Sequence, residues 1–204
     1  MSLFYKYNKT KFFSIFIVLV SFLLLSFEGF SQKKVEFEIA VDQDSVPGIS
    51  RDFVEQLFPE QKVNWFFEKS ADDSTYEAKV KVNKKRYSVE FSYAGEFQDV
   101  EELMKENEVP QYVIDTIRGK LKESFQIIEF KKIQKQYLNK GDVMKVLKER
   151  NLSDAKKEVE INYEIIIFGE SDAKQAYYEY LFDADGLFLK MQELEESSTD
   201  NFFY

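Results

Sequence analysis

Composition excludes the common kinds of nucleophilic and metal chemistry, because the 204-residue chain contains neither histidine nor cysteine. Ser-His and Cys-His catalytic systems each need one of these residues, and so do the usual zinc, haem and iron–sulfur ligand sets. A carboxylate pair of the glycosidase type or a Ser-Lys arrangement remains possible. Glu77 and Glu164 are the candidates for a pair, because each follows a tyrosine in an alternating segment. The simpler interpretation is that both are solvated on the polar side of a strand.

The segment from Asp183 to Gly186 contains the residue types of a calcium loop without their spacing. An EF-hand loop has acids at positions 1, 3 and 5, glycine at position 6 and glutamate at position 12. Here Gly186 falls at the fourth position. A tight turn, in which Asp tolerates left-handed geometry and Gly adopts positive φ, explains these residues better. We therefore predict no metal site and no cofactor.

Net charge argues against nucleic acid and anionic membranes as partners. The formal charge is −9, and it becomes −11 if residues 1–31 are removed, because three lysines and one glutamate leave with them. An acidic protein repels phosphate backbones and anionic lipid. The basic run from Asn83 to Arg86 is short, and we interpret it as a charged hairpin tip.

The first 31 residues have the pattern of a cleavable signal peptide. Three lysines precede an apolar run from Phe12 to Phe27, and the small residues Gly29 and Ser31 stand before Gln32. An uncleaved anchor is the alternative, but a helix of 16 residues spans only about 24 Å, less than the roughly 30 Å hydrocarbon core. We predict cleavage between Ser31 and Gln32, a periplasmic or extracellular location, and no membrane insertion after cleavage.

Two segments share a Val-Pro dipeptide followed by apolar residues at helical spacing. The first begins at Val46 and the second at Val109. A spacing of about four residues predicts a helix with one buried stripe. Proline suits the first helical position, where its missing N–H has no partner to lose. The predicted stripes are Ile49, Phe53 and Leu57 in the first helix and Val113, Ile117 and Leu121 in the second.

Each predicted helix is followed by residues that alternate between apolar and polar. Tyr76–Val82 and Tyr163–Ile167 have the period of two that is typical of strands with one buried face. Each strand is followed by the spacing F-x-x-x-G-x-F, in which Gly95 and Gly186 are 91 residues apart. Both glycines are predicted hairpin-turn residues with positive φ.

These patterns predict an α+β protein in which two tandem helix-plus-antiparallel-sheet repeats form a curved sheet with helices on one side. Val35–Val41 is a predicted leading strand. Val143, Val146 and Leu147 predict a short extra helix that Asp142 can cap. The predicted parts are a signal peptide (1–31), a leading strand and linker (32–44), a first repeat (45–107), a second repeat (108–195) with an inserted helix at about 137–157, and a C-terminal tail (196–204).

The order of these features resembles the PepSY-like, β-lactamase-inhibitor-like family of exported bacterial proteins. The resemblance is carried by the Val-Pro helices, the Tyr-Glu strands and the sequence YEYLFDADGLFLKMQE, and it covers residues 45–195. It implies two helix-and-sheet repeats side by side. The protein that gave the family its name inhibits β-lactamases through a concave sheet, but most members have no established partner. The resemblance does not lead us to predict that this protein inhibits β-lactamases. The predicted inserted helix is also a departure from the helix-and-sheet repeat of the family.

Partner binding is predicted at three apolar residues that alternation places on the polar face: Ile166, Phe168 and Leu181. Strands that are apolar on both sides are covered on both sides. The cover can be the inserted helix, the other half of the protein, or another molecule. Trp65 is a predicted core residue. We predict an exported non-enzymatic binding or inhibitory module for an unidentified protein or peptide, with an envelope accessory protein that assembles through exposed strands as the alternative and a carboxylate-based hydrolase as the least favoured reading.

Overall fold

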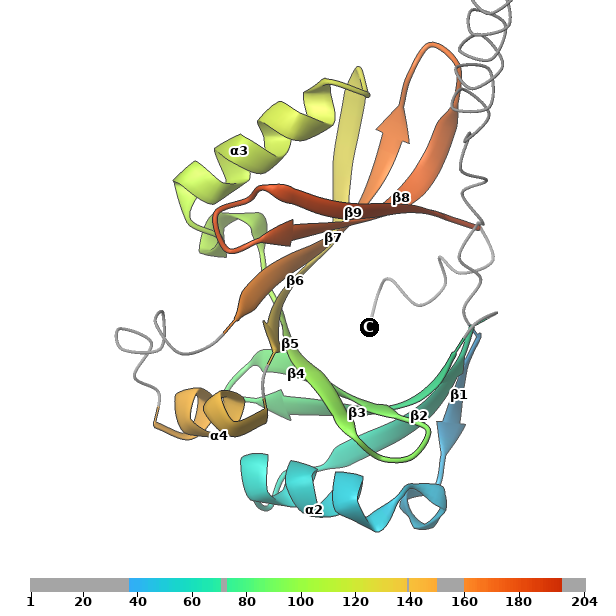
Figure 1. The fold of residues 1–204 in the computed structure, drawn as a ribbon, viewed down its shortest axis with the longest axis vertical. Helices are drawn as coiled ribbons and strands as arrows, with labels where there is room; N and C mark the ends of the chain where they lie inside the picture. Colours follow the sequence, from blue (N-terminus) through green and yellow to red (C-terminus); the bar gives the residue numbers. More distant parts are fainter. Residues whose placement is uncertain (1–36, 71–72, 139, 150–159, 196–204) are drawn as a thin grey trace, which may run out of the picture. The chain divides into compact units, whose positions relative to one another are not determined.

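One antiparallel sheet of nine strands is the framework of the protein in a computed structural model that describes residues 37–70, 73–138, 140–149 and 160–195 (Figure 1). Each strand pairs with the next strand along the chain, so the spatial order runs from β1 to β9. The strands are β1 (Phe37–Val41), β2 (Val63–Lys69), β3 (Ser74–Val82), β4 (Lys85–Ser92), β5 (Phe97–Leu103), β6 (Ile127–Leu138), β7 (Ile161–Glu170), β8 (Gln175–Asp183) and β9 (Phe188–Leu194). The helices are α2 (Gly48–Leu57), α3 (Gln111–Lys122) and α4 (Lys140–Glu149), with 3₁₀ turns η1 (Gln43–Ser45) and η2 (Glu106–Glu108).

The predicted fold, an α+β pair of tandem helix-plus-sheet repeats, was wrong. The described residues are mostly strand, and they form one continuous sheet with three α-helices. The physical reason lies in β6, which continues the sheet beyond β5 by pairing from Asp99 opposite Leu138 to Leu103 opposite Gln134. The same strand supplies Ile133 to one core and Tyr137 to the other.

The first core lies between α2, α4 and strands β2 to β6. Phe53, Leu57 and Trp65 are buried there, as predicted. Ile49 was wrongly placed in the stripe: it is exposed, and Ser50 takes the buried position, where its Oγ donates to the carbonyl of Gly95 at 3.2 Å. The remaining buried members are Val46, Val54, Phe58, Ala78, Val80, Val89, Phe91, Val100, Tyr137, Val143 and Val146.

The second core lies between α3 and strands β6 to β8. The predicted stripe of Val113, Ile117 and Leu121 is confirmed, because all three are buried in this core. The inward residues of the predicted strand, Tyr163, Ile165 and Ile167, are buried beside them. Figure 1 shows α2, α3 and α4 on the outer side of the curled sheet, so both cores lie on one face of it.

The predicted turns are confirmed in detail. Gly95 and Gly186 have φ of 87° and 81°, in the region that glycine adopts without strain. The turn before Gly186 is closed by Asp183, whose Oδ1 accepts hydrogen bonds from the backbone N–H groups of Asp185 and Leu187 at 2.9 and 2.8 Å. The basic run forms the tip between β3 and β4, where Asn83 and Lys84 both have positive φ.

The remaining predictions concern where individual strands and helices begin and end. The leading strand is present as β1. The inserted helix is present as α4, but it begins at Lys140, so Asp142 lies within the helix and not before it. Pro47 and Pro110 each precede the first residue of their helix by one position. No helix within the described ranges is long and apolar enough to span a membrane. The predicted signal peptide, the end of the insertion and the C-terminal tail lie outside the described residues.

Candidate binding face

The sheet face opposite the two cores, which we name the inner face, carries its side chains in cross-strand rows. One row crosses β2 to β5 through Phe66, Glu77, Glu90 and Asp99. The neighbouring row contains Lys79, Ser88, Glu101 and Gln136. Further rows continue across β6 to β8 and contain Gln134, Glu164, Leu181, Lys132, Ile166, Phe168 and Tyr177. Because successive side chains alternate between faces, all of these point away from the cores.

Carboxylates on the inner face are buried, contrary to the prediction for a polar strand face. Glu77 and Glu101 each expose only 4% of their surface, and Asp99 exposes 6%. The interpretation of Glu77 as a solvated residue was therefore wrong. Glu164 shares the face and is partly buried on β7, but three strands separate it from Glu77 on β3.

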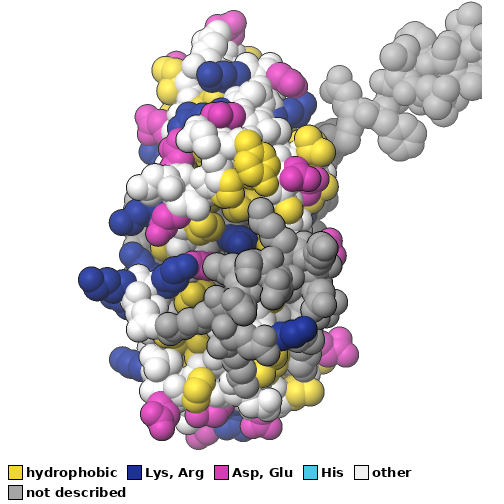
Figure 2. All heavy atoms as spheres, turned by 90° about the vertical axis from the view of Figure 1, so that its left-hand side faces the viewer, with side chains coloured by type: hydrophobic (Ala, Val, Ile, Leu, Met, Phe, Trp, Pro, Cys, Tyr) yellow, Lys and Arg dark blue, Asp and Glu magenta, His cyan; other side chains and the backbone are white. Residues whose placement is uncertain are grey.

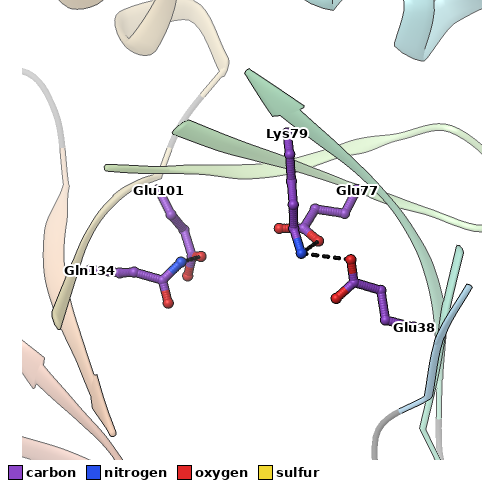
Figure 3. A network of polar contacts seen from close by, with 5 residues as sticks. All are labelled: Glu38, Glu77, Lys79, Glu101 and Gln134. Carbon is purple, nitrogen blue, oxygen red and sulfur yellow. Dashed lines mark hydrogen bonds and ion pairs between the residues drawn. The ribbon is translucent and has the colours of Figure 1, made fainter. Parts of the chain in front are cut away.

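Lys79 neutralises one group of these carboxylates (Figure 3). Its Nζ lies 2.6 Å from Oε1 of Glu38 and 3.1 Å from Oε2 of Glu77, so β1 and β3 are joined by one cation. Burial alone lowers the pKa of Lys79, but the charges and hydrogen bonds of Glu77 and Glu38 outweigh it and raise the pKa. The ammonium group therefore stays charged.

Replacing Lys79 with methionine is expected to lower the free energy of unfolding by about 2 to 3 kcal/mol, because it leaves two largely buried carboxylates without their cation. Methionine retains most of the apolar stem, so loss of packing contributes little. Urea unfolding at pH 7.5 measures the effect. Lys81→Met, on the same strand and face but exposed, is the matched control, and an equal loss in both variants would contradict the assigned role.

A second carboxylate group has no such cation. Carboxyl oxygens of Glu90, Asp99 and Glu101 lie within 4.8 Å of one another, and within the described ranges no ion pair joins them to lysine or arginine. Burial is the main cause that raises the pKa of all three groups, to about 7 for Asp99. Mutual repulsion adds to the rise for Glu90 and Glu101.

Amide groups from β6 hold two members of this group in position. Gln136 Nε2 donates to Asp99 Oδ2 at 2.9 Å, and Gln134 Nε2 donates to Glu101 Oε2 (Figure 3). Lys132 also faces the group from β6. Burial alone lowers the pKa of Lys132, but the charges of Glu101 and other inner-face acids raise it above its usual value.

A pocket of about 520 Å³ opens at one end of the inner face. Its apolar lining includes Phe66 and Leu103. Three of its basic side chains, those of Lys62, Lys81 and Arg86, are exposed. Two further lysines of the lining, Lys79 and Lys132, are the inner-face cations described above. Figure 2 shows lysine and arginine side chains gathered along one margin of the molecule, in a protein whose total charge is negative.

The three residues predicted to bind a partner all lie on the inner face of the second half. Ile166 is buried against Leu194 and Tyr177. Phe168 contacts the ring of Tyr177, with 5.3 Å between centroids, and is partly buried, as is Leu181. The inserted helix, one of the three possible covers, does not cover these residues, because Val143 and Val146 of α4 pack in the first core on the opposite face.

Sequence reasoning missed Glu90, Asp99 and Glu101. Their alternation along β4 and β5 is visible in the sequence, but their convergence depends on the register of the hairpin at Gly95. A β-bulge at Glu90–Phe91 changes that register and places Glu90 opposite Asp99. A count of residues back from the turn does not reveal such a bulge.

Comparison with known proteins yields a likeness of fold alone. No family model and no curated protein matches the chain. Solved structures of DUF2874 family proteins from Bacteroides uniformis and Bacteroides ovatus align with TM-scores of 0.51 and identities of 12% and 14%, covering 78% and 79% of this chain and 99% of each of those chains. A structure described as a candidate periplasmic protein from Bacteroides eggerthii aligns at a TM-score of 0.49 and 14% identity, over 72% of this chain and 88% of its own.

Proposed function

We propose that this protein is an exported, non-enzymatic binding module that recognises an acidic segment of another protein through its inner face. The pocket of about 520 Å³ carries the proposal, because it combines exposed cations with an apolar wall. A pocket of this kind binds a carboxylate and an adjacent apolar side chain together.

The charge of the pocket supports an acidic partner. Lys62, Lys81 and Arg86 are exposed, and no ion pair occupies them within the part of the chain that the structure describes. Their charge is local, since the whole chain is acidic. A partner with carboxylates is therefore attracted to this end of the inner face, whereas one with a uniform negative charge is repelled by the rest.

Apolar residues further along the same face supply the second part of the surface. Phe168, Tyr177 and Leu181 are partly buried on β7 and β8. Partly exposed aromatic and aliphatic side chains are typical anchors of protein interfaces, with charged groups at the margin. The buried Ile166 packs with Leu194 against Tyr177.

Export and cleavage between Ser31 and Gln32 are part of the proposal. They rest on the basic and apolar pattern of residues 1–31. The resemblance of residues 45–195 to the PepSY-like family remains a prediction. The separation of Glu77 from Glu164 by three strands supports a binding role over hydrolysis by that pair.

Assembly through sheet edges is the second candidate function, and exposed apolar residues at both edges favour it. Phe37 and Ile39 of β1 are 62% and 60% exposed, and Leu189 and Met191 of β9 are 49% and 42% exposed. Edge strands with apolar side chains are suited to pairing with another chain.

A capture experiment tests the binding proposal and separates the two candidates. The tagged protein is incubated with the envelope fraction of its host, and captured proteins are quantified for wild type and for Lys81→Glu/Arg86→Glu. We expect a partner whose recovery falls at least about tenfold in the double variant and also falls as salt increases.

Lys69→Glu/Lys122→Glu is the charge-matched control, because both lysines are exposed and lie outside the pocket. It should retain the partner. Equal recovery by both double variants would refute the pocket as the binding site. Loss of the partner only in Ile39→Lys/Met191→Lys would favour assembly through the edges instead.

A further inference from the structure

The carboxylates of Glu90, Asp99 and Glu101 converge on one point of the inner face. One carboxyl oxygen from each lies within 4.8 Å of the others. Calcium binds oxygen at about 2.4 Å, so the ligands of one ion lie no more than about 5 Å apart, and this group is compact enough to hold one. We propose that these three residues form a calcium-binding site; the proposal does not rest on the proposed function, although Glu101 also lines the pocket.

Asp99 provides the observation that distinguishes this group from an ordinary acidic cluster. Its side chain is more than nine-tenths buried, with 6% exposure. Oδ2 accepts the hydrogen bond from Gln136, but Oδ1 is buried and no described group bonds to it. A buried carboxylate oxygen without a partner is costly, and a cation in the group would satisfy it.

The carboxylate group that contains Lys79 shows what the group of Glu90, Asp99 and Glu101 lacks. Glu38, Glu68 and Glu77 also place carboxyl oxygens within 4.8 Å of one another. There the ammonium of Lys79 lies 2.6 Å from Glu38 and 3.1 Å from Glu77, so the protein supplies its own cation. Across the described ranges no lysine or arginine forms an ion pair with Glu90, Asp99 or Glu101. Lys132 faces this group from β6 and interacts with Glu101, so one lysine faces three carboxylates, and negative charge remains for a cation to balance.

The site is rigid and made of oxygen ligands. Asn162 Nδ2 donates to Gln136 Oε1 at 3.2 Å, and Gln136 in turn donates to Asp99, so a chain of amides orients the carboxylate. The bulge beside Glu90 turns that residue toward Asp99. Carboxylate oxygens favour hard cations. Magnesium demands near-ideal octahedral geometry and releases its waters reluctantly, whereas calcium accepts less regular sets of carboxylate oxygens, so calcium is the expected ion.

Calcium binding by the purified full chain is tested by titration calorimetry and thermal unfolding at pH 7.5, after EDTA treatment and dialysis. The probes are CaCl₂ and MgCl₂. With a dissociation constant of about 1 mM, 10 mM calcium multiplies the ratio of folded to unfolded protein by about eleven, which raises the midpoint by about 3 to 6 °C.

Matched variants locate the ion. Asp99→Asn and Glu90→Gln should each abolish the calcium heat and the midpoint rise, whereas Glu68→Gln, with the same charge change in the group that contains Lys79, should keep both. The proposal is overturned if folded wild type shows no response to 10 mM calcium. It is also overturned if Asp99→Asn responds like wild type, or if magnesium gives the same rise, which would indicate general screening.

Discussion

Replacing Asp99 with asparagine is expected to make the metal-free protein more stable at pH 8 and to weaken its dependence on pH. Asp99 faces Glu90 on β4 and Gln136 on β6, with Glu101 two residues away on its own strand. Burial raises the pKa of its carboxyl to about 7; the hydrogen bond from Gln136 lowers the pKa in part and the charge of Glu77 raises it. Asparagine keeps the size of the side chain and removes the charge.

The sign follows from proton binding. In the unfolded chain an aspartate loses its proton near pH 4. Between about pH 4 and pH 7 the folded protein therefore binds more protons than the unfolded chain, so stability falls as pH rises through this window and stays low above it. We expect wild type in EDTA to be less stable at pH 8 than at pH 5 by an amount on the order of 3 kcal/mol. The variant should lose the part of the pH dependence that Asp99 contributes.

Urea unfolding at pH 5 and pH 8 in EDTA measures both effects. The control is Asp52→Asn, which removes an exposed carboxylate on α2 and should leave the pH dependence unchanged. A residual slope in Asp99→Asn is expected, because burial also raises the pKa of Glu90 and Glu101. Wild type that is more stable at pH 8 than at pH 5 would contradict the prediction.

Gly95→Ala is expected to destabilise the protein by about 2 to 5 kcal/mol, from the left-handed backbone and from overpacking together. The residue has φ of 87°, and a Cβ there would lie 2.6 Å from Cβ of Pro47 and 2.9 Å from Cγ2 of Ile49. These atoms belong to the start of α2 and to the residue before it, so the β4–β5 hairpin and α2 would have to separate. Thermal and urea unfolding measure the loss.

Gly119→Ala is the matched substitution with the opposite sign. Gly119 is exposed within α3, and a Cβ there meets no atom within 4 Å. Alanine should therefore stabilise the protein by about 0.5 to 1 kcal/mol through its higher helix propensity. If Gly95→Ala were as harmless as Gly119→Ala, the close packing of the hairpin on α2 would be wrong.

Local structure was predictable where one physical cause acts within a short segment. The stripe of Val113, Ile117 and Leu121 follows from helical period, and the turn glycines Gly95 and Gly186 follow from the need for positive φ. The stripe was misjudged at Ile49, because the hairpin at Gly95 approaches α2 so closely that the small Ser50 faces it and Ile49 is displaced to the surface.

The fold and the site depend on contacts between distant segments, which period alone does not reveal. The pairing of β5 with β6 joins what sequence reasoning treated as two repeats. The inner-face carboxylates are individually ordinary residues on alternating strands. Their burial and convergence arise from the curl of the sheet and the bulge at Glu90, so only Glu77 and Glu164 were named, and for a different role.

The strand order has a kinetic consequence. Every strand pairs with its neighbour along the chain, from β1 to β9. The segment between two paired strands is therefore either a short turn or a connection that contains a single α-helix. A sheet with this topology has fewer sequence-distant pairings than a Greek key, and folding is faster when contacts are local. Strands can be added one at a time from the N-terminal end, so a chain that emerges gradually from a narrow channel can fold as it arrives.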